Sequence, residues 1–137
     1  MGQNVVIDHI GIGVRDYEES RRFYERALAP LELALVAEIE ADNRAAGFGR
    51  GGRDDFWIHE GRPLGRMHVA FEADSSEAVD GFHAAALEAG ARDNGAPGLR
   101  PEYSETYYAA YVLDPNGNNI EAVFHGDAPS RKGQVVR

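Results

Sequence analysis

Cysteine is absent from this sequence of 137 residues. The chain therefore has no disulfide framework, no thiolate metal ligand and no cysteine nucleophile. It also lacks an apolar run long enough to span a bilayer, and its first residues contain no apolar signal-peptide core. We expect a cytoplasmic protein that has no membrane partner.

Basic residues are fewer than acidic ones, 14 against 23, which gives a net charge of -9. Because nucleic acids and anionic membranes call for basic patches, this balance disfavours both as partners. The chain is 43% hydrophobic and 27% charged, as in ordinary globular proteins. Its length predicts a single domain over residues 1–126, followed by a C-terminal tail over residues 127–137.

Residues 107–124 have the pattern of two β-strands joined by a tight turn. The flanks are rich in aromatic and β-branched residues, and Asp-Pro-Asn-Gly at residues 114–117 has the chemistry that reverses a chain. The second strand carries one charge, Glu121. Glutamate is poorly suited to a half-buried strand, so Glu121 faces either solvent or a site that uses a carboxylate.

The chain before this hairpin reads as strands and helices in a repeated order. A strand over residues 5–14 is followed by a helix that begins at Asp16 and ends at Pro30, and then by three further strands. Those strands are predicted over residues 31–39, 45–48 and 56–59.

The same order then starts again. A strand over residues 67–71 precedes a helix that begins at Ser75 or Ser76 and ends near Gly90. A loop that contains Pro97, Gly98 and Pro101 is expected to lead to the hairpin.

These two halves align with each other at a single offset. When the strand that contains His9 is aligned with the strand that contains His68, residues of the two helices match as well. The matched helix pairs are Phe23 with Phe82, Ala27 with Ala86 and Leu28 with Leu87. Four matches at one offset indicate two copies of one unit, over about residues 4–62 and 64–126. The predicted fold class is α+β, with two β-α-β-β-β modules that form a cupped, incomplete barrel.

Three ionisable residues fall on strand faces that point away from the helices. Period-2 alternation places His9, His68 and Glu121 opposite the apolar faces of the first, fifth and last strands. Two neutral imidazoles and a carboxylate suit a divalent metal, Fe, Mn, Ni or Zn, with open positions. Each residue alone reads as a surface residue, but the three together indicate a metal site. His83 and His125 lack this support and are interpreted as surface residues.

Further side chains are predicted to face the same trough. His59 is a candidate general acid or base near neutral pH, although an exposed histidine at a strand end is an equal alternative. Tyr103, Tyr107 and Tyr111 are candidates to line a pocket, with Trp57 as a stacking wall. Such a pocket suggests a small oxygenated substrate, with an aromatic one as an option, whereas tyrosine-rich strands also occur as plain packing.

Together these residues resemble the vicinal oxygen chelate superfamily, which includes glyoxalases, extradiol dioxygenases and bleomycin-binding proteins. The resemblance runs from Asp-His-Ile-Gly at residues 8–11 to the Asp-Pro-Asn-Gly turn and Glu121. It implies a glyoxalase-like fold, frequently a homodimer, with His9, His68 and Glu121 as metal ligands. Metal-using members hold two oxygens of a small substrate on the metal, which acts as a Lewis acid.

Departures from the superfamily patterns bear on the reaction. Trp57 stands where a glyoxalase has a metal-binding glutamate, and Gly13 stands where short bacterial glyoxalases have a glutathione-binding arginine. Together they weigh against glutathione-dependent lactoylglutathione lyase activity. The run from Tyr111 to Glu121 resembles the final signature of extradiol dioxygenases, in which the tyrosine contacts the substrate, but the preceding histidine of that signature is missing.

The leading interpretation is a metal-dependent enzyme with lyase or isomerase chemistry on a substrate with adjacent oxygens. His59 and Tyr111 are its candidate catalytic residues. One alternative is an extradiol-type dioxygenase. Another, from a different class, is a metal-free protein that binds a drug or metabolite.

Overall fold

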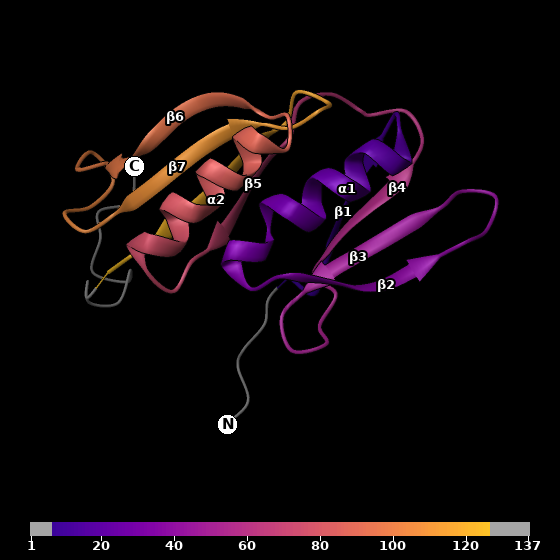
Figure 1. The fold of residues 1–137 in the computed structure, drawn as a ribbon, viewed down its shortest axis with the longest axis horizontal. Helices are drawn as coiled ribbons and strands as arrows, with labels where there is room; N and C mark the ends of the chain where they lie inside the picture. The colour runs from indigo at the N-terminus through magenta and orange to yellow at the C-terminus, as the bar shows by residue number, and fades with distance from the viewer. Residues whose placement is uncertain (1–6, 127–137) are drawn as a thin grey trace.

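The computed structural model describes residues 7–126 (Figure 1). Both halves show the predicted β-α-β-β-β order, which confirms the fold class. The division into one domain and a tail stays a prediction, because residues 1–6 and 127–137 lie outside the described part. The elements are β1 (Ile10–Val14), α1 (Tyr17–Ala27), the 3₁₀ turn η1 (Ala29–Leu31), β2 (Ala34–Ile39), β3 (Ala45–Gly49), β4 (Phe56–Glu60), β5 (His68–Glu72), α2 (Ser76–Glu88), β6 (Arg92–Leu99), β7 (Tyr108–Leu113) and β8 (Asn119–Phe124).

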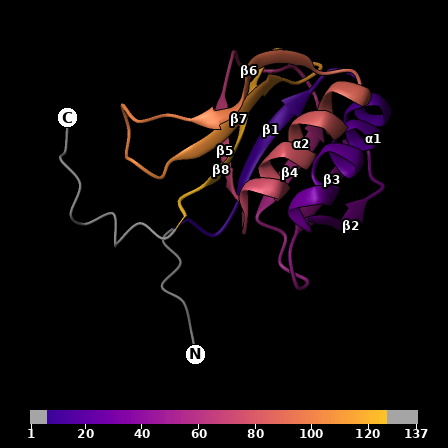
Figure 2. The same ribbon diagram turned by 60° about the vertical axis from the view of Figure 1, so that its left-hand side comes forward.

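Each module forms one open four-stranded sheet. The strand orders are β1-β4-β3-β2 and β5-β8-β7-β6, so the second module repeats the topology of the first. In each sheet one strand pair is parallel, β1 with β4 and β5 with β8, and the others are antiparallel. The helices α1 and α2 contact each other and lie on the same side of the two sheets (Figures 1 and 2). The opposite sheet faces are left without a covering helix in the described part of the chain.

Alternation along the strands divides each sheet into a core face and a bare face. The predicted helix-packing residues Val14, Ile58, Ile120 and Ala122 are fully buried. Where the modules meet, the rings of Phe56 and Phe71 pack edge-on with centroids 5.2 Å apart, and the whole core cluster includes both modules. We call the two sheet faces that point away from the helices the bare faces, and their side chains are available to form a binding site.

Both helices begin at the predicted capping residues. The Asp16 side chain accepts a hydrogen bond from the Glu19 backbone N–H at 3.1 Å, and Ser75 accepts one from Ala78 at 3.1 Å. These bonds satisfy donors that a helix leaves free at its first turn. Gly90 follows α2 with a φ of 107°, a left-handed conformation that favours glycine.

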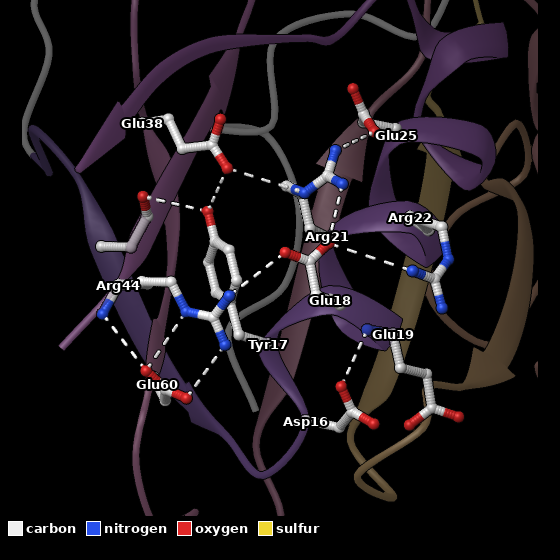
Figure 3. Close-up of polar contacts among 11 residues, drawn as sticks. Asp16, Tyr17, Glu18, Glu19, Arg21, Arg22, Glu25, Glu38, Arg44 and Glu60 are labelled. Atoms are coloured by element: carbon white, nitrogen blue, oxygen red, sulfur yellow. Dashed lines mark hydrogen bonds and ion pairs between the residues drawn. The ribbon is translucent and has the colours of Figure 1, made fainter. Parts of the chain in front are cut away.

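A charged network fastens α1 to its sheet (Figure 3). The Tyr17 hydroxyl donates to Glu38 at 2.7 Å, and the Arg44 guanidinium lies 4.7 Å from the centre of the Tyr17 ring. Burial, and then the hydrogen bond to Glu38, raises the pKa of Tyr17. Arg21 forms ion pairs with Glu38 and with carboxylates of its own helix. Arg21 therefore links α1 to β2 through Glu38.

The Asp-Pro-Asn-Gly turn joins the two modules. Asp114 is only 5% exposed, and it accepts a hydrogen bond from the Tyr24 hydroxyl of α1 at 2.5 Å. Its other oxygen accepts the backbone N–H groups of Asn116 and Asn118. The Asn116 side chain in turn donates to Ser20 of α1 at 3.2 Å. The turn is thus predicted correctly, and it also anchors the hairpin to the first module.

The predicted loop around Pro97 and Gly98 is wrong over residues 92–99, which form the edge strand β6. Its pairing with β7 shifts register between Asp93 and Gly95 and again between Gly95 and Gly98. An edge strand tolerates proline because one side of it needs no partner, and bulges absorb irregular residues.

The interpretation of His83 as a surface residue is also wrong. His83 on α2 is 9% exposed, and its Nε2 lies 2.9 Å from Asp93 Oδ1 of β6. The pKa of Asp93 is lowered first by a backbone hydrogen bond from Gly95 and then by His83. His83 therefore ties α2 to the strand that the sequence did not reveal.

Two strands begin later than expected. In the described residues the first strand starts at Ile10, and His9 lies in the segment just before it. The second strand starts at Ala34, because Glu32, which caps η1, has a φ of 63° that breaks the extended run. No helix within residues 7–126 has the length and apolar character needed to cross a membrane.

Candidate metal centre

The bare face of the second sheet brings His68 and Glu121 together. β5 and β8 are parallel neighbours in which Ala70 lies beside Glu121, and alternation puts His68 on the same face as Ala70. His68 Nε2 and Glu121 Oε1 are 2.8 Å apart. Two of the three predicted metal ligands are therefore in direct contact.

Burial makes Glu121 unusual. The residue is 2% exposed, whereas the His68 side chain is 53% exposed. Within residues 7–126 its one ion pair is with His68, and no arginine approaches it closely enough to form another. A buried carboxylate is costly unless it is hydrogen-bonded, paired or bound to a metal, and a divalent cation beside His68 would meet this requirement. An imidazole nitrogen and a carboxylate oxygen are also donors that fit Zn, Fe, Mn or Ni.

Tyr107 binds the second oxygen of the same carboxylate. Its hydroxyl donates to Glu121 Oε2 at 2.5 Å. Burial, and then the hydrogen bond and charge of Glu121, raises the pKa of Tyr107. The Tyr107 ring lies 5.0 Å from Tyr103 and 5.3 Å from His125, centroid to centroid. His125 is half-buried, so the sequence interpretation of a surface residue misses its place against this tyrosine.

Tyr111 faces the same carboxylate from β7. It lies directly opposite Glu121 in the β7–β8 ladder, and its ring is 6.4 Å from that of His68. Burial, and then the negative charge of Glu121, raises the pKa of Tyr111. On its other side the Arg100 guanidinium lies 5.3 Å from the ring centre. A Cβ at the neighbouring Gly95 would come within 2.8 Å of Tyr111, so the glycine leaves room for the ring.

Trp57 and His59 lie on the bare face of the first sheet, as their alternation predicts. The Trp57 ring lies over Gly47, where an added Cβ would be 2.7 Å from it. His59 is exposed, and its ring lies close to Gly11 and Gly13, which have no side chains in its way. In the described residues no hydrogen bond or ring contact links this face to the His68–Glu121 pair.

His9 does not join the pair within one chain. Its side chain is 60% exposed, and Nδ1 lies 2.9 Å from Asp8 Oδ1. Among residues 7–126 no three histidine, aspartate or glutamate side chains come close enough to hold a metal ion. Of the three predicted metal ligands, His68 and Glu121 lie together in one chain, whereas the role of His9 stays a prediction.

A groove gives solvent access to His68. It has a volume of about 490 Å³ and lies between β5 and the edge of the first sheet. The strands β1 and β5 are edges of their sheets and do not pair across it. Its lining includes Ile10, Arg50, Phe56, His68, Ala70 and Glu72.

Residues 6–122 match the glyoxalase/bleomycin resistance protein/dioxygenase superfamily. The chain belongs to this superfamily, which confirms the resemblance drawn from its sequence. A search of curated proteins found no match.

Solved structures show the same fold. A glyoxalase/bleomycin resistance protein from Albidiferax ferrireducens T118 is 28% identical with a TM-score of 0.72, covering 88% of this chain and 98% of that one. A glyoxalase/bleomycin resistance protein/dioxygenase family enzyme from Burkholderia phytofirmans PsJN is 21% identical with a TM-score of 0.64, covering 86% and 97%. Glyoxalase I from Zea mays is 21% identical with a TM-score of 0.66; the match covers 88% of this chain and 46% of the maize chain.

The sequence missed how Tyr107 is used. It marked Tyr107 as pocket lining, whereas the hydroxyl binds the predicted metal ligand Glu121. A signal was present, because Tyr107 and Tyr111 share one face of a hairpin whose partner strand presents Glu121. The roles of Arg100 and His125 had no comparable signal in the sequence.

Proposed function

We propose that this protein is a metal-dependent enzyme that acts on a small substrate with two adjacent oxygens. His68 and Glu121 would hold a divalent metal, Fe, Mn, Ni or Zn. The observation that carries the proposal is the buried Glu121 carboxylate in contact with His68, at 2.8 Å, on an uncovered sheet face. When bound, the metal would supply Lewis-acid stabilisation of negative charge that develops on substrate oxygen.

The third ligand is proposed to be His9 of a second copy of the chain. Such a metal site needs three protein ligands, and the described part of one chain assembles two of them. A homodimer that placed the bare face of the first sheet of one protomer over that of the second sheet of its partner would complete the set. The same arrangement would bring Trp57 and His59 to the site.

Tyr111 and His59 are the proposed catalytic residues. The phenol of Tyr111 is protonated at neutral pH, as an ordinary tyrosine is, so it can donate a hydrogen bond to a substrate oxygen. His59 would take or give the proton in lyase or isomerase chemistry. Trp57, supported by Gly47, offers a flat face on which a planar substrate would stack.

An extradiol-type dioxygenase is the second candidate. It is supported by the sequence signature that runs from Tyr111 to Glu121, and by their positions directly opposite each other in the β7–β8 ladder. The substrate would then be a catechol and the metal iron. Glutathione dependence is not proposed, because Trp57 and Gly13 replace the residues that it would need.

The experiment compares reactions of the metal-loaded protein. We expect deuterium exchange from solvent into an α-hydroxy ketone, followed by NMR, and a loss of at least tenfold in Tyr111→Phe because a transition-state hydrogen bond is removed. Tyr108→Phe is the control, since its hydroxyl binds Asp80 at 2.7 Å and not the site. Ring cleavage of catechol by the iron form would favour the dioxygenase instead. Tight ligand binding without metal would contradict both and identify a binding protein.

A further inference from the structure

We propose that Tyr107 is a positioning residue that fixes the Glu121 carboxylate, so that Oε1 alone is presented to the metal. The inference rests on the proposed metal site and adds a residue that does not itself bind the metal.

The two oxygens of Glu121 have different partners. Oε1 lies 2.8 Å from His68 Nε2, on the side where the second ligand stands. Oε2 accepts the Tyr107 hydroxyl at 2.5 Å, which is short for a hydrogen bond between two oxygens. A carboxylate can bind a metal through one oxygen or through both. The Tyr107 phenol uses one lone pair of Oε2 and restrains the carboxylate, and this favours binding through Oε1.

Packing holds the Tyr107 hydroxyl in place. The ring centroid lies 5.0 Å from that of Tyr103, and His125 meets the Tyr107 ring edge-on at 5.3 Å. His125 is itself tethered, because the Thr106 hydroxyl donates to its backbone carbonyl at 2.6 Å. The hydroxyl therefore has little freedom to leave Oε2, as is required of a group that orients a ligand.

This arrangement matters for a substrate that chelates through two oxygens. A glutamate that binds through one oxygen leaves one more position open than a glutamate that binds through two. Removing the Tyr107 hydroxyl takes this hydrogen bond from Oε2 and leaves the carboxylate less restrained. Removing a residue that hydrogen-bonds a metal ligand typically lowers metal affinity or activity by about 10–100-fold.

The test is a titration of the metal-free protein with Co²⁺, read by its visible absorption spectrum. We expect Tyr107→Phe to weaken Co²⁺ binding by about tenfold or more and to change the band positions, because the carboxylate coordinates differently. Tyr108→Phe loses a hydroxyl at the next position, where it bonds Asp80 instead, and should match the wild type in both respects. A purely structural role for Tyr107 would lower the urea midpoint and leave the spectrum unchanged.

The outcomes separate the two proposals. If wild-type protein binds Co²⁺ and Tyr107→Phe binds it equally with the same spectrum, the role of Tyr107 is overturned and the metal site stands. If wild-type protein binds no metal, both fall. Should Tyr107→Phe fail to fold, a crystal structure of the metal-loaded wild type decides: Tyr107 still bonded to Oε2 supports the inference, and both oxygens on the metal overturn it.

Discussion

Glu121 is tolerated in an otherwise apolar strand because each of its oxygens has a partner. Alternation in the sequence predicted its face and that of His68 correctly, since the period of a strand is a local property. Its burial to 2% exposure could not be predicted, because the covering tyrosines come from another strand and the loop before it. The same limit applies to Asp114, whose turn was predicted but whose bond to Tyr24 was not.

The Tyr24–Asp114 bond should stabilise the protein measurably. Burial, and then the charge of Asp114, raises the pKa of Tyr24 well above its usual 10.0. We expect Tyr24→Phe to lower the free energy of unfolding by about 2 kcal/mol at pH 7, as for a hydrogen bond to a charged group. Unfolded tyrosine loses its proton above pH 10 while folded Tyr24 keeps it, so this contribution falls as the pH rises.

Urea unfolding at pH 7 and at pH 11 measures this effect. The cost of Tyr24→Phe should be smaller at pH 11 than at pH 7. Tyr103→Phe is the control, because Tyr103 is 51% exposed and its loss should cost little at either pH. If Tyr24→Phe lowered the free energy of unfolding equally at pH 7 and pH 11, the pKa of Tyr24 would not be raised in the folded protein.

Elements were predictable where their pattern is regular. Both helix caps and the hairpin turn were found, because capping and turn chemistry are local. The strand β6 was missed because Pro97 and its neighbouring glycines resemble a loop, and only pairing with β7 reveals an edge strand. The error over His83 follows directly, since its partner Asp93 lies on that strand.

Gly47 on β3 should determine where the Trp57 ring lies. A Cβ at Gly47 would be 2.7 Å from the indole, so Gly47→Ala must displace the ring. Trp57 is the single tryptophan of the chain, and we expect its fluorescence emission maximum to shift. Gly11→Ala is the matched control, because an added Cβ there meets its nearest atoms at an ordinary 3.7 Å. Identical spectra for Gly47→Ala and wild type would refute this support of the ring.

At the scale of the molecule, the repeat in the sequence predicted two modules and their common topology. It could not predict how the modules sit against each other. That arrangement depends on contacts between distant residues, such as Phe56 with Phe71 and Tyr24 with Asp114. It also leaves His9 away from the His68–Glu121 pair, so one chain does not complete the predicted triad.

Mixing two defective variants tests whether a site is shared between copies. We expect His9→Ala and His68→Ala each to lose metal binding. In a mixed dimer one of two symmetric sites would keep both histidines, so random exchange should restore about a quarter of the wild-type metal content. The measurement is metal content after the variants are unfolded and refolded together. No recovery in the mixture would contradict a site built from two protomers.

If Glu121 and His68 hold a metal, the purified protein should contain it. Elemental analysis of protein purified without chelators should find close to one Fe, Mn, Ni or Zn per chain. His68→Ala and Glu121→Gln should abolish it, while Glu88→Gln, an exposed glutamate at the end of α2, should not. Wild-type protein that binds none of the four metals, even after reconstitution with each, would rule out a metal held by Glu121 and His68.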